Sequence, residues 1–266
     1  MDVKPIENYK NPTYPTKEEA QKNPNLLKTM PERWRGNAYA AVAFSSLLLM
    51  TLTACSGKEH VGETTGTAGQ VAPLFIHGDG RGSFGCVSVA PPAFLSEEEA
   101  YSVIAEEAER EGIILTRGAP TLTDITVPKT SLNYDSSTKN NTGTQKGDLA
   151  LDGYDEEKQI AFEFVSKEDM HTWAGKQGIM SSVETFRFLE AAEVLSKGMA
   201  GKTEQMTVAT FYDPHYIYDT KEIQEIIQDH QGDYNVMEEK LRERVKADLR
   251  EQVRDFLSWL KSQGIV

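Results

Sequence analysis

The chain is poor in cysteine, in basic residues and in histidine motifs, and each shortage excludes a class of protein. Its 266 residues include two cysteines, which are too few for a disulfide framework. Lysine and arginine total 28 against 41 acidic residues. This balance speaks against nucleic acid as the main partner, because binding phosphates needs a basic surface. The histidines do not stand at the spacing of a zinc-protease motif; they are His60, His77, His171, His215 and His230.

One stretch of the chain is long and carries no charge. Residues 37–54 read NAYAAVAFSSLLLMTLTA, a length at the lower limit for spanning a bilayer. Arg33 and Arg35 precede the run, so its positive flank is expected to face the cytoplasm. The sequence therefore predicts that the part of the chain after residue 54 lies on the other side of the membrane and is held there.

The four residues Leu52-Thr53-Ala54-Cys55 resemble the lipobox of bacterial lipoprotein precursors. In that motif an aliphatic residue and two small residues precede the cysteine that becomes lipidated. The resemblance covers residues 33–56 and implies a lipid on Cys55 and an extracytoplasmic domain anchored at the cell membrane. The alternative is an uncleaved membrane helix with an incidental cysteine. The long region before residue 37 favours that alternative, because signal peptides begin with a short basic region.

Composition divides the chain into four parts. Residues 1–36 are interpreted as a cytoplasmic N-terminal region, and residues 37–54 as the signal or membrane segment. Residues 55–70 are rich in glycine and threonine and predict a flexible tether. Residues 71–266 are numerous enough to bury one sizeable core, and they predict a single exported globular domain.

The expected fold class of this domain is α+β or α/β, with a single mixed β-sheet covered by several helices and a long C-terminal helix. Ser96 and Glu99 have the spacing of a capping box, so a helix is expected over 97–111, ending at Gly112. The same spacing after Ser166 and Ser181 predicts a short helix and then a buried helix over 183–198.

The remaining segments are assigned from their residue types. Two more helices are expected over 219–232 and 235–264, the second capped by Asn235 and Glu238. Residues 128–147 contain many turn formers and predict a long loop. Residues 149–151 are expected to form a hairpin with 160–165. Other strands are expected over 71–76, 86–89, 113–116, 121–127 and 206–212.

The stretch GRGSFGCV, residues 80–87, matches the glycine-rich loop of protein kinases. The lysine on the next strand and the other kinase motifs are missing, so nucleotide binding is not expected. Residues 71–76 and 86–89 flank the glycines and predict a hairpin with the glycines at its tip. His77, Asp79 and Arg81 at this tip are a candidate ligand-binding group. The alternative is a turn whose charges are simply solvated.

Three acidic residues are candidate ligands of a divalent cation. They are Asp152, Asp155 and Glu163, placed around the predicted hairpin. The order of elements here is similar to that of the restriction-endonuclease-like fold. That resemblance implies that an Asp and a Glu on neighbouring strands hold Mg²⁺. The position that the family fills with lysine is Val165 here, which puts activation of the attacking water in doubt.

The segment after the strand at 206–212 is aromatic, and Tyr212 and His215 are candidate binding residues at the rim of a pocket. Buried tyrosines under the C-terminal helices are the alternative. The leading hypothesis is a membrane-anchored lipoprotein whose domain is a binding or assembly module for an envelope protein or a small-molecule ligand, without enzymatic activity. The second hypothesis is a metal-dependent hydrolase centred on Asp152 and Glu163.

Overall fold

The computed structural model describes residues 69–85, 93–132, 143–175, 183–215, 221–230 and 233–266. The charge-free run at 37–54, Cys55 and the predicted tether up to residue 68 lie outside these ranges. Within the described ranges, no helix has the length and apolar character needed to cross a bilayer. The described residues up to Leu257 belong to one compact body, and those from Ser258 onward belong to a separate unit.

A mixed β-sheet forms the centre of this body, as the sequence predicts. Its four strands follow the order β1 (Gln70–Val71), β8 (Thr207–Tyr212), β6 (Ile160–Val165) and β5 (Gly153–Asp155). The first three are parallel and β5 is antiparallel to β6. Two antiparallel pairs accompany this sheet. They are β2 (Arg81–Gly85) with β7 (Val183–Arg187), and β3 (Thr121–Lys129) with β4 (Gly143–Ala150).

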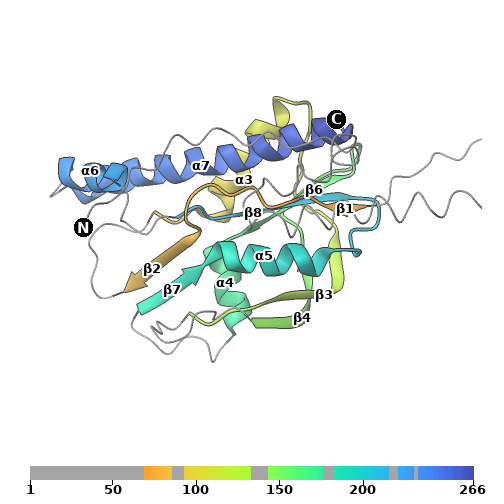
Figure 1. Ribbon diagram of the computed structural model, residues 1–266, viewed down its shortest axis with the longest axis horizontal. Helices are drawn as coiled ribbons and strands as arrows, with labels where there is room; N and C mark the ends of the chain where they lie inside the picture. Colours follow the sequence, from red (N-terminus) through yellow and green to blue (C-terminus); the bar gives the residue numbers. More distant parts are fainter. Residues whose placement is uncertain (1–68, 86–92, 133–142, 176–182, 216–220, 231–232) are drawn as a thin grey trace, which may run out of the picture. The chain divides into compact units, whose positions relative to one another are not determined.

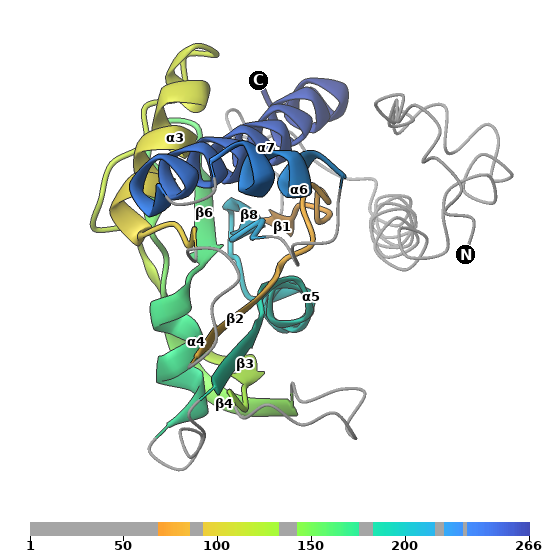
Figure 2. The same ribbon diagram turned by 90° about the vertical axis from the view of Figure 1, so that its left-hand side faces the viewer.

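Helices cover both faces of the central sheet, as Figures 1 and 2 show. In Figure 2, α3 (Glu97–Glu109) and α7 (Tyr234–Gln263) lie on one side, and α5 (Phe188–Met199) lies on the other. Two shorter helices are α4 (Lys167–Ala174) and α6 (Lys221–Asp229). The predicted class, a mixed sheet with several helices and a long C-terminal helix, is confirmed.

The strands β6 and β8 are buried along their whole length, because helices cover both faces of the sheet. The register pairs Ala161 with Val208 and Val165 with Tyr212, so these side chains share the face that packs on α5. Between them, the register pairs Glu163 with Thr210. A carboxylic acid and a hydroxyl therefore lie side by side in an otherwise apolar layer.

Two predicted helix starts are confirmed in atomic detail. Ser96 accepts a hydrogen bond from the Glu99 N–H at 3.2 Å, and the Glu99 carboxylate accepts one from the Ser96 N–H at 3.2 Å. Ser166 and Asp169 form the same reciprocal pair at the start of α4. A capping box uses residues only three apart, so local sequence is enough to place it.

The start of α7 differs from the prediction by the identity of the cap. The helix begins at Tyr234, so Asn235 lies inside its first turn. Asp233 takes the capping position, and its carboxylate accepts a hydrogen bond from the Val236 N–H at 3.2 Å. Asp and Asn cap helices about equally well, so two adjacent candidates cannot be separated by residue type alone.

The helix expected over 183–198 is wrong in its first five residues. Val183–Arg187 form the strand β7, and the helix starts only at Phe188. Three of these five residues are β-branched or aromatic, which favours a strand, and Phe186 is fully buried. A distant strand, β2, supplies the pairing partner.

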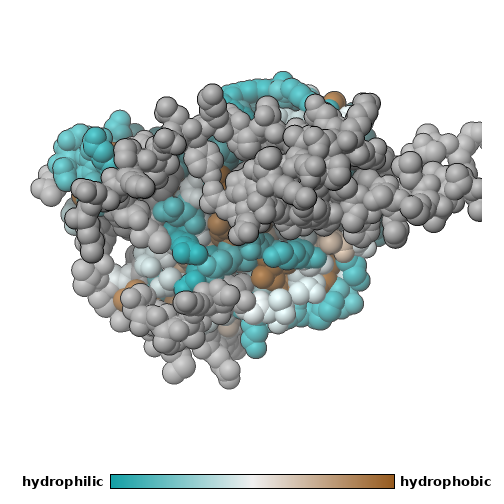
Figure 3. Space-filling view, in the orientation of Figure 1, coloured by the Kyte–Doolittle hydropathy of each residue, from teal (hydrophilic) through white to brown (hydrophobic). Residues whose placement is uncertain are grey.

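In Figure 3, hydrophilic residues dominate the described surface over α5, as expected for a helix with one buried face.

The glycine stretch does not form the expected hairpin. Arg81–Gly85 are themselves a strand, and their partner is β7, about a hundred residues later. The segment 86–89 lies outside the described residues. Of the predicted strand at 71–76, only Val71 is in a strand, and at 113–116 only Thr116 forms a bridge, with Tyr154. The end of the predicted loop 128–147 belongs to β4, and β5 rather than 149–151 pairs with β6.

Candidate functional site

Several of the predicted site residues meet at the carboxyl end of β8, where Tyr212 ends the strand. Its hydroxyl accepts a hydrogen bond from the His77 N–H at 3.1 Å and donates one to the His77 carbonyl at 3.0 Å. Gln252 of α7 bonds the backbone of Tyr212 in both directions. Its Oε1 accepts from the Tyr212 N–H at 3.2 Å, and its Nε2 donates to the Tyr212 carbonyl at 3.1 Å. The Gln252 amide thus makes the two hydrogen bonds to the Tyr212 backbone that a neighbouring strand would otherwise make.

The imidazole of His77 faces α7. Its Nε2 lies 2.9 Å from Oδ2 of Asp255, and both side chains are largely buried. The backbone carbonyl of His77 also accepts a hydrogen bond from Gln252 Nε2 at 3.3 Å. The predicted candidate His77 is therefore held on three sides, by β8, by an amide and by a carboxylate of α7.

Arg81 does not join His77. Its guanidinium lies 2.8 Å from the Glu190 carboxylate of α5, which also pairs with Arg187 at 3.1 Å. Burial first, and then the charges of Glu251 and Asp79, raise the pKa of Asp248 on α7 to about 7, while the charge of His77 lowers it. Of the residues that the sequence places at one tip, His77 thus pairs with a carboxylate of α7 and Arg81 with one of α5.

Asp213 and His215 follow β8 and lie inside the protein. Asp213 is fully buried, and its two carboxylate oxygens accept hydrogen bonds from the N–H groups of Leu95 and His215, both at 2.9 Å. Burial raises the pKa of Asp213 to about 7. Burial lowers the pKa of His215 to about 4, so its ring is neutral at physiological pH. That ring lies 4.3 Å from the ring of Phe94, centroid to centroid.

Gly82 of β2, and Gly80 just before that strand, allow this packing. A Cβ on Gly82 would lie 2.5 Å from His215 Cδ2 and 2.5 Å from Phe94 Cε1. Gly80 has a φ of +59°, and its Cβ would lie 2.7 Å from Tyr212 Cε2. Both positions therefore require glycine so that rings can approach the backbone, a role unrelated to phosphate binding.

A second group of acids lies beside β6. Glu163 is 2% exposed, and its Oε2 has no hydrogen-bond partner among the described residues. Burial first, and then the charges of Asp152, Asp169 and Glu97, raise its pKa well above the usual range. Burial also raises the pKa of Asp152 to about 6 and that of Asp169 to about 7. Repulsion between these carboxylates therefore favours their protonated forms.

The three predicted cation ligands do not act as one set. Glu163 lies in β6, whereas Asp152 lies just before the neighbouring strand β5 and not within it. Asp152 Oδ2 accepts the Phe164 N–H at 2.7 Å. Asp155 accepts N–H bonds from Ile114 at 2.7 Å and Lys158 at 2.8 Å, which fixes a turn.

The described part of the chain contains no group of three or more His, Cys, Asp or Glu side chains placed to hold a metal ion. The acids beside β6 therefore fit a divalent cation poorly, because such a cation needs several oxygen ligands at once.

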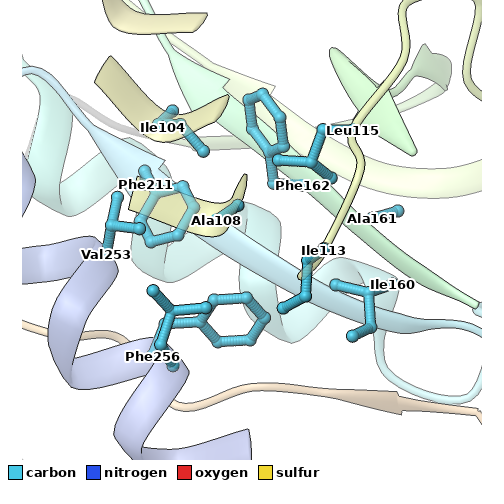
Figure 4. Close-up of a pocket in the computed structure, with 11 residues that line it drawn as sticks. Ile104, Ala108, Ile113, Leu115, Ile160, Ala161, Phe162, Phe211, Val253 and Phe256 are labelled. Carbon is cyan, nitrogen blue, oxygen red and sulfur yellow. The ribbon is translucent and has the colours of Figure 1, made fainter. Parts of the chain in front are cut away.

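A pocket opens on the other face of the sheet, between α3, β6, β8 and α7 (Figure 4). The enclosed space is about 10 Å³, roughly what one water molecule needs, and the hollow around it is open to solvent. Eleven residues line it, and every one is apolar. They include Phe162 and Phe211 from the sheet and Phe256 from α7, whose rings point into the space in Figure 4. Next to the lining residues Ile113 and Leu115, Ile114 is 58% exposed.

Sequence reasoning missed Gln252, Asp255 and Asp248, which complete the surroundings of His77. Their spacing of four and then three residues places them on one face of α7, beside the buried Leu249 and Val253. The signal available in the sequence was this row of polar residues beside the apolar stripe of the helix. Comparisons with protein-family models, with curated proteins and with solved structures find no match for this chain.

Proposed function

We propose that this chain is a membrane-anchored lipoprotein whose exported domain is a binding or assembly module, and that the apolar pocket between α3 and α7 receives the partner. The partner is an envelope protein that inserts an apolar side chain, or a small apolar ligand. The anchor is supported by Leu52-Thr53-Ala54-Cys55 directly after the charge-free run at 37–54.

The observation that carries the binding role is the composition of the pocket. Its lining has no polar side chain, while binding sites for apolar groups are concave and mainly apolar. Because the enclosed space is only about 10 Å³, a partner's apolar side chain enters it when the lining side chains move apart. The exposed Ile114 extends the apolar surface beside the pocket, where a larger partner can make contact.

The pocket is tested with toluene as the probe, followed by NMR shifts of the isoleucine, leucine and valine methyl groups. Ala108 lines the pocket, so Ala108→Leu is expected to fill it and weaken toluene binding at least about tenfold. Ala105→Leu on the same helix is the matched control, since Ala105 is not among the lining residues. Equal binding to both variants would contradict the proposed site.

The anchor is tested independently by mass spectrometry of the mature N-terminus. A diacylglycerol-modified Cys55 at the new N-terminus is expected, and Cys55→Ser is expected to release the domain from the membrane fraction. An unmodified Cys55 in the native membrane would refute the anchor and leave the pocket unaffected.

One observation favours the second function, a metal-dependent hydrolase centred on Asp152 and Glu163. Glu163 Oε2 is buried without a hydrogen-bond partner among the described residues, which leaves this oxygen available to an ion, although the described residues supply no set of three ligands around it. Calorimetric titration with Mg²⁺ compares the native protein with Glu163→Gln. Heat of binding that disappears in the variant supports this function, and no heat with the native protein removes it.

A further inference from the structure

The strand β4 has one long edge that no other strand of the described ranges covers. Its strand pairing within those ranges is with β3 alone, in a two-stranded sheet. Figures 1 and 2 show β3 between α5 and β4, so β4 is the outer strand. Side chains along β4 are exposed in alternation, at Thr144, Lys146, Asp148 and Ala150. The open edge of such a strand is a template for pairing with another strand.

Two observations show which backbone groups of β4 point to this edge. Pro128 of β3 has no N–H and stands opposite Thr144, so the backbone groups of this pair point away from each other. The Leu151 N–H bonds a carbonyl just before β3 at 3.3 Å. Because these directions alternate along a strand, the odd-numbered residues of β4 bond β3. The N–H and C=O groups of Lys146 and Asp148 therefore point to the open edge.

The open edge carries one charge of each sign. Lys146 is 64% exposed, and its Nζ donates to the Asp124 carbonyl of β3 at 3.2 Å. Asp148 Oδ1 accepts a hydrogen bond from the Asp124 N–H at 2.9 Å. The edge closes at Asp152, whose N–H bonds the Phe162 carbonyl of β6 at 3.0 Å. A partner strand that pairs before this point therefore meets a lysine and an aspartate two residues apart.

One register lets this edge pair with its own copy through opposite charges. Antiparallel pairing of two identical strands is symmetric about a central residue, and groups that face the edge must lie opposite each other. An axis through Gly147 places Lys146 opposite Asp148 of the second copy, twice. An axis through Lys146 or through Asp148 places like charges opposite each other, which destabilises a sheet. The charges of β4 therefore favour the register centred on Gly147.

We propose that β4 is a homodimerisation edge, which pairs antiparallel with β4 of a second copy of this chain about Gly147. In the dimer, the backbone groups of Lys146 bond those of Asp148 in the second copy. Lys146 then lies between Asp124 of its own chain and Asp148 of the other. A lysine on an edge strand discourages pairing, and in this register the aspartate of the second copy offsets its charge. The inference depends on neither the apolar pocket nor the membrane anchor.

Sedimentation velocity of the full-length protein in excess nonionic detergent micelles tests the proposal. The micelles keep the charge-free runs at 37–54 of different chains apart. One strand pair is a small interface, so a weak dimer with a Kd of about 1–100 μM is expected. Native protein that is entirely monomeric at about 100 μM would overturn the proposal.

Two charge reversals test the register. Lys146→Glu places acids opposite each other, and Asp148→Lys places bases opposite each other. Each variant alone is therefore expected to dimerise at least about tenfold more weakly than the native protein. A mixture of the two variants restores both pairs of opposite charges, so a heterodimer of native-like affinity is expected. Lys129→Glu is the matched control, because Lys129 is an exposed residue of β3 and lies away from the open edge.

Circular dichroism verifies that the variants fold, since Asp148→Lys removes the bond to the Asp124 N–H. If that variant does not fold, Lys146→Glu decides. A dimer that Lys146→Glu leaves unchanged, or that Lys129→Glu weakens equally, forms elsewhere and overturns the proposal. Folded variants that stay monomeric when mixed refute the pairing about Gly147.

Discussion

Replacing Glu163 by glutamine is expected to make the protein more stable above neutral pH. Glu163 is 2% exposed, and burial raises its pKa well above the usual value. The folded protein therefore holds a proton on Glu163 at pH values where the unfolded chain has released it. Glutamine has nearly the same shape as the protonated acid and does not titrate. The variant therefore does not lose stability through this group as the pH rises.

The sign and size of the effect follow from proton linkage. A raised folded-state pKa makes stability greatest below the unfolded value, 4.5, and lowers it as pH rises toward the folded value. One such group changes the free energy of unfolding by at most about 1.4 kcal/mol per pH unit. Asp152 and Asp169 also have raised pKa values and add to the slope, which the variant reduces but does not abolish.

The assay is urea denaturation of the full-length protein at several pH values between about 5 and 8. Glu163→Gln is expected to lose less stability over this range than the native protein, by up to about 1.4 kcal/mol per pH unit. Glu239→Gln is the control, since Glu239 is an exposed residue of α7. Parallel curves for the native protein and Glu163→Gln would refute the reasoning, as would an equal change in the control.

Two further substitutions test the contacts at the end of β8. Gln252→Leu keeps the volume but leaves the buried N–H and C=O of Tyr212 without their hydrogen bonds to the amide. The free energy of unfolding, measured by urea denaturation, is therefore expected to fall by about 3 kcal/mol. A fall of less than about 1 kcal/mol would contradict this role of Gln252. Gly82→Ala forces a Cβ to within 2.5 Å of the His215 ring and is expected to cost about 1–3 kcal/mol. Gly143→Ala, whose nearest contact is 3.7 Å, should change the melting temperature little, and equal shifts for both glycine variants would count against the packing role.

Elements with local signals could be predicted from the sequence. The capping boxes at Ser96 and Ser166 each use residues three apart, so no distant contact is needed to place them. The strands β6 and β8 are mainly apolar runs, which is typical of parallel strands covered on both faces. The candidate His77 was found because its polar neighbours and the glycines stand together in the chain.

The surroundings of His77 could not be predicted in the same way. Its partner Asp255 is 178 residues away, and nothing in either local sequence indicates the other. The cation site predicted from Asp152, Asp155 and Glu163 is tested by the Mg²⁺ titration. Within the described residues, Asp155 serves a turn through its bonds to two backbone N–H groups. Such turn acids and metal ligands have the same residue type and cannot be separated by sequence.

The sequence by itself determined the class of the fold, the helix caps at Ser96 and Ser166 and the two buried strands, because these depend on residue type and short-range spacing. Tertiary structure decided the role of the glycine stretch, which pairs with β7 and lets His215 and Phe94 approach the backbone. It also decided that Gln252 of α7 bonds the Tyr212 backbone at the end of β8, and that His77 lies beside Asp255 of α7. The physical reason is that strand pairing and buried polar contacts join residues far apart in the chain, and the entropy of closing such loops is offset only when the whole body packs.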